Sequence, residues 1–191
     1  MSSPAAFHRA VAAGFTERVE GAERLGRWDA AAPVAGWTAR DVVRHLVDWL
    51  PAFLQGSAGV VLDVGEAPSV EEDPVGAWRA QADAVQALLD DPATASIRVD
   101  NPHLGDPTVP EALSRIYSPD VFMHTWDLAR ATGQAEDLDP DLAAEMFAGM
   151  EPMDQMLRAS GQFGPRVPVP DDVDPVTRLM AFIGRDPSFR P

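Results

Sequence analysis

Apolar side chains near the start of the chain recur every four residues, which is the spacing of one face of an α-helix. The recurring residues are Phe7, Val11, Phe15 and Val19. Ser3 and Pro4 stand just before them, an order typical of a helix start, because serine caps the first turn and proline fits its backbone angle. The sequence therefore predicts a helix from Pro4 to about Leu25.

Five further stretches combine helical spacing with start or stop signals. Thr38 caps the second helix, and Asp41 stands three residues later in the capping-box position. Gly133 and Gly161 are natural helix ends. We expect the five helices after Thr38 and at about Val70–Leu89, Glu111–Thr132, Pro140–Gly161 and Pro175–Ile183. Long loops separate them, and one loop contains SIRVD, residues 96–100, which has the pattern of a short strand. The pattern predicts an all-α fold.

The bulk composition limits the class of protein. A chain of 191 residues suits a single domain, which we place at residues 1–191. No apolar run approaches the roughly 20 residues that cross a bilayer, and no secretory signal precedes the first helix. We therefore expect a cytoplasmic protein.

Charge and cysteine content exclude several functions. The formal net charge is −15, with arginine as the only strongly basic residue type. Such a chain repels phosphate backbones and anionic lipids, so we expect neither nucleic-acid nor membrane binding. The chain has no cysteine, which excludes disulfides, thiolate metal ligands and a cysteine nucleophile. Any thiol chemistry needs a thiol from outside the chain.

Two stretches share the pattern D-V-x-x-H-x-x-D, one at residues 41–48 and the other at 120–127. On a helix, offsets of four and seven residues return to nearly the same face. Each stretch therefore places two acids and a histidine on one stripe. The two stripes consist of Asp41, His45 and Asp48, and of Asp120, His124 and Asp127.

A carboxylate and an imidazole on adjacent helical turns can bind one cation, and a third ligand from a facing helix leaves positions open for water or substrate. Asp120 and His124 form such a pair, and His45 is the candidate third ligand. Asp127 and Asp48 would then accept hydrogen bonds from the ligand imidazoles. Because nothing in the sequence encodes a redox partner, we expect zinc or nickel.

Each of these residues also has a purely structural interpretation. Asp41 is sufficiently explained as a capping-box acid. Acid–histidine pairs four residues apart are common on helices, so a hydrogen-bonded core histidine remains the alternative to a ligand. Trp49, Arg130 and His103 are candidates to line a substrate pocket. Their alternatives are packing, a surface salt bridge and solvent exposure respectively.

Several motifs together resemble a known family. They are GWTARDVVRHLVDW at 36–49, HTWDLARATG at 124–133, FGPRVPVPDDVDP at 163–175 and RLMAFIGRDP at 178–187. The chain resembles the DinB-like superfamily, in the branch that shares the N-terminal metal-binding domain of mycothiol-dependent maleylpyruvate isomerase. The resemblance implies an up-down-down-up four-helix bundle, here with long loops and a short additional C-terminal helix. It also implies a divalent metal held by His45, Asp120 and His124.

The resemblance further implies a reaction type. An external low-molecular-weight thiol such as mycothiol would attack a small electrophilic substrate in a transferase or isomerase reaction, and the metal would favour the thiolate. We therefore expect a small-molecule substrate and the thiol as partners. Two alternatives stay open: a non-catalytic metal- or ligand-binding stress-response bundle, and a structural helical homodimer without metal.

Overall fold

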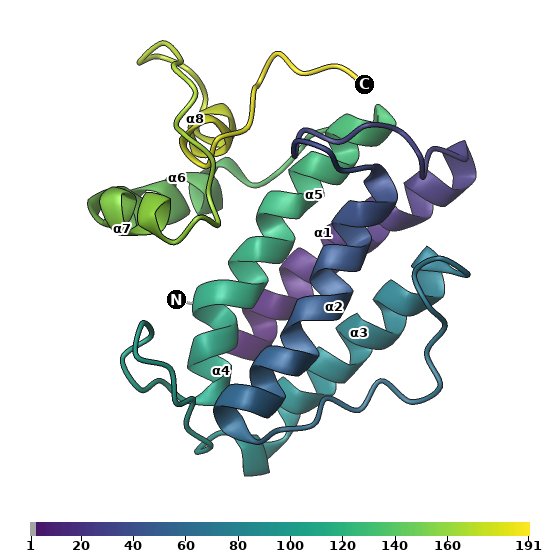
Figure 1. The fold of residues 1–191 in the computed structure, drawn as a ribbon, viewed down its shortest axis with the longest axis vertical. Helices are drawn as coiled ribbons and strands as arrows, with labels where there is room; N and C mark the ends of the chain where they lie inside the picture. The colour runs from purple at the N-terminus through teal and green to yellow at the C-terminus, as the bar shows by residue number, and fades with distance from the viewer. Residues whose placement is uncertain (1–2) are drawn as a thin grey trace.

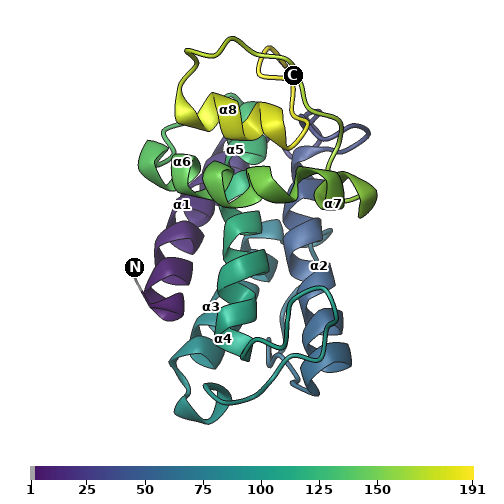
Figure 2. The same cartoon turned by 90° about the vertical axis from the view of Figure 1, so that its left-hand side faces the viewer.

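The computed structural model describes residues 3–191, and all regular elements in that range are helical. Four long helices form a bundle (Figure 1). They are α1 (Pro4–Leu25), α2 (Ala39–Ala58), α3 (Pro74–Asp90) and α5 (Ser118–Thr132). Helices α1 and α5 run in one direction and α2 and α3 in the other (Figures 1 and 2). The predicted all-α, up-down-down-up bundle is confirmed.

The segment 59–73 makes this order possible because it runs along the bundle, so that α3 begins near the end where α2 begins (Figure 1). Two arginines of α2 attach this segment. Arg40 donates to the carbonyl of Val70 at 2.9 Å, and the Nε of Arg44 donates to Glu71 at 3.0 Å. No helix described between residues 3 and 191 is both long and apolar enough to cross a membrane.

The helix starts follow the predicted capping chemistry. Ser3 accepts a hydrogen bond from the backbone N–H of Ala6 at 3.2 Å. Thr38 and Asp41 form a complete capping box, in which the Asp41 carboxylate accepts from the Thr38 backbone N–H at 2.7 Å. This box accounts for Asp41 as a helix-start residue. Gly133 ends α5 in a left-handed conformation with φ 73°.

Two predicted elements differ in the structure. The third helix begins at Pro74 instead of about Val70, because the Asp73 side chain caps it by accepting from the N–H of Gly76 at 2.9 Å. The expected strand at 96–100 is absent among the described residues, where Arg98 forms only an isolated bridge with Thr108.

The predicted helix from Pro140 to Gly161 is broken near its middle by Pro152. A proline inside a helix lacks the backbone N–H and collides with the carbonyl four residues earlier. The observed parts are α6 (Pro140–Met150), a 3₁₀ turn (Glu151–Met153) and α7 (Asp154–Ala159). Met153 and Met156 in these parts are 42% and 52% exposed.

The predicted helix at 111–132 contains a wider turn just before its D-V-x-x-H stretch. Helix α4 (Val109–Ala112) continues through a π-helical turn (Leu113–Tyr117) into α5. There the N–H of Ser118 donates to the carbonyl of Leu113, five residues earlier. Pro119 explains the widening, because a regular α-helical turn would push its ring against a carbonyl.

His8 lies fully buried on α1, with its ring 5.8 Å from that of Tyr117. Burial lowers the pKa of His8 from 6.5 to about 4, and the nearby Ala82 backbone offsets this only in part. Between these two values the unfolded chain binds more protons than the folded one. The free energy of unfolding should therefore fall as the pH drops from 6.5 towards 4.

Replacing His8 with leucine should remove this pH dependence. Between pH 7.5 and 4.5 the natural chain should lose about 2.5 kcal/mol more of its free energy of unfolding than His8→Leu does, at ~1.4 kcal/mol per pKa unit. Urea denaturation of both proteins with a chelator present measures the difference. Equal losses in both would show that His8 is not held neutral by burial.

Candidate metal centre

Three side chains from two helices meet near the middle of the bundle. His45 comes from α2, and Asp120 and His124 come from α5. One ligand atom from each residue lies within 4.8 Å of the other two. Within residues 3–191, no other group of three histidine or acidic side chains converges in this way. We call these three residues the His–Asp–His cluster.

Asp120 joins the two histidines of the cluster. Its Oδ2 lies 3.0 Å from Nε2 of His45, and its Oδ1 lies 3.4 Å from Nε2 of His124. The indole N–H of Trp49 also donates to Oδ2, at 3.2 Å. The exposed fractions of the side chains are 32% for His45, 20% for Asp120 and 5% for His124. Solvent therefore reaches the cluster from the His45 side.

The surroundings of Asp120 keep it ionised. Burial alone raises the pKa of its carboxyl, but the His124 and His45 rings and the hydrogen bonds from His45 and Trp49 outweigh burial. The net effect holds the pKa of Asp120 below its ordinary value. An anionic carboxylate at this point attracts a cation.

His124 is oriented by a partner on its other ring nitrogen. Its Nδ1 lies 2.9 Å from Oδ2 of Asp127, which is fully buried. Burial raises the pKa of Asp127, but the Arg185 guanidinium and His124 outweigh burial and lower that pKa overall. Because an ionised carboxylate only accepts hydrogen bonds, Nδ1 of His124 carries the proton. Nε2 is therefore the ring nitrogen of His124 that faces Asp120.

Two tryptophans flank the cluster. The Trp37 ring stacks on that of His124 at 5.8 Å with an interplanar angle of 19°, and lies 5.1 Å from that of His45. The Trp49 ring lies 6.3 Å from that of His45. Such aromatic surroundings limit access of water to ligand side chains.

These residues fit a divalent cation. Imidazole and carboxylate are common zinc and nickel ligands, and two atoms bound to one ion at about 2.1 Å lie at most about 4.2 Å apart. The donors of the His–Asp–His cluster need to approach one another by less than about 1 Å to meet this limit. His124 already turns Nε2 towards Asp120, because Asp127 holds its Nδ1. His45 would first have to release or move the Nε2 proton that it donates to Asp120.

The structure does not bring all predicted site residues to the cluster. Asp48 is exposed and forms no hydrogen bond to either histidine among the described residues. It follows His45 by three residues, as Asp127 follows His124, but α2 presents it to solvent whereas the C-terminal segment covers Asp127. The prediction that Asp48 orients a ligand is therefore corrected.

Two of the three predicted pocket residues also lie elsewhere. His103 is exposed in a turn. Arg130 donates to the carbonyls of Pro187 at 2.9 Å and Phe189 at 3.3 Å, so it attaches the end of the chain to α5. Only Trp49 of the three contacts the cluster.

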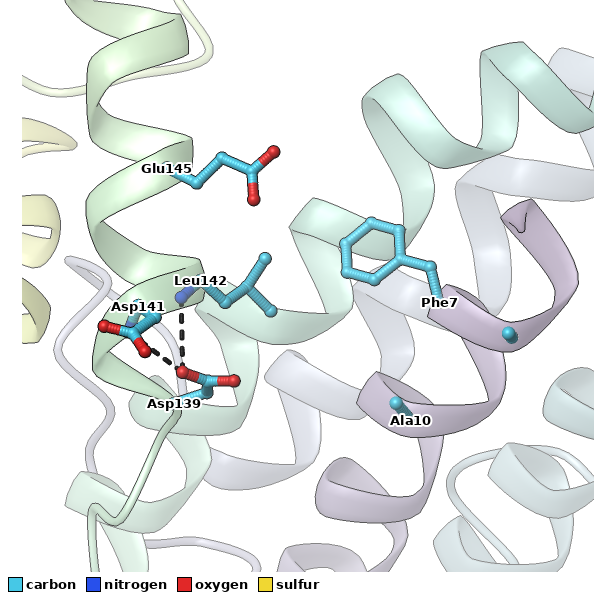
Figure 3. Close-up of a pocket in the computed structure, with 7 residues that line it drawn as sticks. Phe7, Ala10, Asp139, Asp141, Leu142 and Glu145 are labelled. Carbon is cyan, nitrogen blue, oxygen red and sulfur yellow. Dashed lines mark hydrogen bonds between the residues drawn. The ribbon is translucent and has the colours of Figure 1, made fainter. Parts of the chain in front are cut away.

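A surface pocket of about 340 Å³ lies between α1 and α6, away from the His–Asp–His cluster. Figure 3 shows Phe7 and Leu142 facing each other across it, beside the acidic side chains of α6. Asp139 at its edge is engaged in capping α6, because it accepts from the N–H groups of Asp141 and Leu142. None of these residues contacts the cluster.

Sequence reasoning missed two residues of this region, Trp37 and Arg185. Trp37 lies in the loop before α2, where no periodic pattern applies. Arg185 lies 58 residues from Asp127, so no helical spacing connects them. A signal for Arg185 was present in the acid itself, because Asp127 stands between the apolar Trp126 and Leu128. A carboxylate buried among apolar side chains needs a cationic partner.

Replacing Trp49 with phenylalanine tests the hydrogen bond to Asp120, because the ring stays and the N–H is lost. We expect zinc affinity to fall by about tenfold, at the lower end of the effect of hydrogen-bond partners of metal ligands. Competition with a chromophoric chelator measures this. Trp37→Phe is the matched control, since the Trp37 N–H forms no bond to the cluster, and equal losses in both variants would refute the role of the N–H.

Comparison with known proteins identifies a family that this chain matches. The family described as mycothiol maleylpyruvate isomerase N-terminal domain matches residues 8–129, which contain the whole His–Asp–His cluster. Two uncharacterised proteins of Mycobacterium tuberculosis, one from strain CDC 1551 / Oshkosh and one from strain ATCC 25618 / H37Rv, are each 32% identical over 156 residues. Each alignment covers 80% of this chain and 82% of the relative. No solved structure matches the chain.

Proposed function

This chain belongs to the family of the mycothiol maleylpyruvate isomerase N-terminal domain, and on that premise we propose that it is a metal- and thiol-dependent enzyme. In this proposal His45, Asp120 and His124 bind one zinc or nickel ion. A low-molecular-weight thiol of the mycothiol type then reacts with a small electrophilic substrate, as in a transferase or an isomerase. The observation that carries the proposal is the convergence of the three donors within 4.8 Å on a side open to solvent.

Each residue of the site has a part in this proposal. Asp120 supplies the negative charge that holds the cation, and the Trp49 N–H fixes its carboxylate. His124 keeps its Nδ1 proton in the hydrogen bond to Asp127, so Nε2 is the ring nitrogen that would bind the ion. A bound divalent ion supplies a positive charge that lowers the pKa of a thiol or water beside it.

The open positions of the ion decide between a catalytic and a structural site. Three protein ligands leave at least one position for an exchangeable molecule, whereas structural zinc sites use four protein ligands. The described residues bring only three donors together. Small molecules would approach from the His45 side, where the cluster is most exposed.

Cobalt substitution tests the thiol part of the proposal. Adding mycothiol to the cobalt-loaded protein should produce a sulfur-to-cobalt absorption band and change the visible spectrum. The S-methylated thiol is the control, because it keeps the shape of the ligand and cannot form a thiolate. A thiol that leaves the spectrum of a tightly bound cobalt ion unchanged would favour the non-catalytic binding bundle instead.

A further inference from the structure

The last residues of the chain return to the bundle next to the cluster. Helix α8 (Pro175–Phe182) packs against α6, and the C-terminal tail, residues 183–191, then passes over α5 (Figure 2). Arg185 in this tail reaches Asp127 of α5. Its Nε lies 3.0 Å from Oδ1 and 3.1 Å from Oδ2, and its Nη2 lies 3.0 Å from Oδ2.

The two charged groups are well shielded from water. The Arg185 side chain is 13% exposed and that of Asp127 is not exposed at all. A two-nitrogen contact of this kind fixes the plane of a carboxylate as well as its charge. Oδ2 of Asp127 accepts from Arg185 and also from Nδ1 of His124 at 2.9 Å. The orientation of the guanidinium therefore sets the orientation of the imidazole.

We infer that Arg185 is a positioning residue for His124, acting through Asp127, so that the C-terminal tail is a functional part of the metal centre. This inference rests on the metal-binding part of the proposed function. Arg185 touches neither the cluster nor the open side where small molecules would approach. Its effect is to fix the plane of the Asp127 carboxylate, which keeps the hydrogen bond from Nδ1 of His124 and turns Nε2 towards the cluster.

The backbone before Arg185 is held in a conformation that directs the Arg185 side chain towards Asp127. The N–H of Arg185 donates to the carbonyl of Met180 at 2.9 Å, at the end of α8. Gly184 has φ 92°, and a Cβ there would lie 2.8 Å from backbone atoms of Gly164. Only glycine fits this close approach of two backbone segments. The tail therefore leaves α8 in a fixed direction, with the Arg185 side chain towards α5.

A second arginine, Arg130, makes it possible to distinguish the positioning of His124 from the attachment of the tail to α5. Arg130 of α5 also binds the tail, through the carbonyls of Pro187 and Phe189, and stacks over Trp126 at 4.6 Å. Arg130 contacts neither Asp127 nor the cluster. Loss of Arg130 and loss of Arg185 should therefore both weaken tail attachment, but only loss of Arg185 should disturb His124.

The experiment compares Arg185→Gln, Arg185→Lys and Arg130→Gln by two measurements. The first is the tautomer of the neutral His124 imidazole, read from long-range ¹H–¹⁵N spectra of the metal-free protein at a pH high enough to deprotonate the ring. The natural chain and Arg130→Gln should show a single tautomer, with the proton on Nδ1. Arg185→Gln should show a mixture of the Nδ1–H and Nε2–H tautomers. Arg185→Lys, which keeps the charge without the two-nitrogen contact, should lie between them and provides the comparison if Arg185→Gln does not fold.

The second measurement is zinc affinity by chelator competition. Arg185→Gln should bind zinc about 10- to 100-fold more weakly, the range for hydrogen-bond partners of metal ligands. Arg130→Gln should lower the zinc affinity much less than Arg185→Gln does. Equal zinc losses in both variants, or an unchanged His124 tautomer in Arg185→Gln, would overturn the inference. A natural chain that binds no zinc would contradict the proposed function and the role of the tail in a metal centre. The positioning of His124 by Arg185 would still be decided by the tautomer, which is measured without metal.

Discussion

His124→Ala should abolish stoichiometric binding of zinc or nickel. The substitution removes one of three donors, and the loss should exceed the roughly 10- to 100-fold effect of changing an outer hydrogen-bond partner. Elemental analysis of untagged protein, dialysed against a known free zinc concentration, measures it. The natural chain should retain about one ion, and the variant close to none.

Two acids of the other stripe are the controls for this result. Asp48→Ala removes an exposed carboxylate, and Asp41→Asn alters a side chain that serves the start of α2 and the neighbouring Arg44. Both should keep the metal content of the natural chain. Metal loss in Asp48→Ala as large as in His124→Ala would mean that the ligand set is assigned wrongly.

Asp127→Ala should cause the largest loss of stability. It leaves the nearly buried Arg185 guanidinium without its carboxylate and His124 Nδ1 without its acceptor. Removing one partner of a buried ion pair costs about 3–5 kcal/mol, because the remaining charge stays poorly solvated. Chemical denaturation with a chelator present measures the free energy of unfolding without any contribution from metal.

The double variant Asp127→Ala/Arg185→Met is the control for that loss. It removes the uncompensated charge and keeps a side chain that can fill part of the space, so it should be more stable than Asp127→Ala alone. A loss below about 1 kcal/mol in the single variant would equal that of an exposed ion pair. Such a result would contradict the buried contact between the tail and α5.

The fold could be predicted from the sequence because its signals are local. Apolar residues such as Phe7 and Phe15 repeat at helical spacing, and Ser3, Thr38 and Gly133 mark helix ends through contacts within a few residues. Prediction was wrong at Pro152, which interrupts an otherwise regular pattern. The π-helical turn before Pro119 was not predicted, because neighbouring segments decide whether a proline ends a helix or distorts it.

The candidate site was predictable only in part, for a related reason. The pairing of Asp120 with His124 follows from helical spacing within one helix. The two D-V-x-x-H-x-x-D stretches are alike in sequence, yet Asp127 is fully buried and Asp48 is exposed. The difference comes from the C-terminal tail, which covers α5 and brings Arg185 to Asp127 over 58 residues of chain. No local pattern encodes which of two similar helices the tail will cover.

X-ray absorption spectroscopy of the metal-loaded natural chain tests the central claim most directly, namely that the His–Asp–His cluster binds an ion that keeps open positions. We expect about five or six nitrogen and oxygen donors at roughly 2.1 Å, including two imidazoles, with at least one donor replaced when a thiol is added. A four-coordinate ion held only by protein ligands and unaffected by thiol would contradict the claim, because it would mark a structural site.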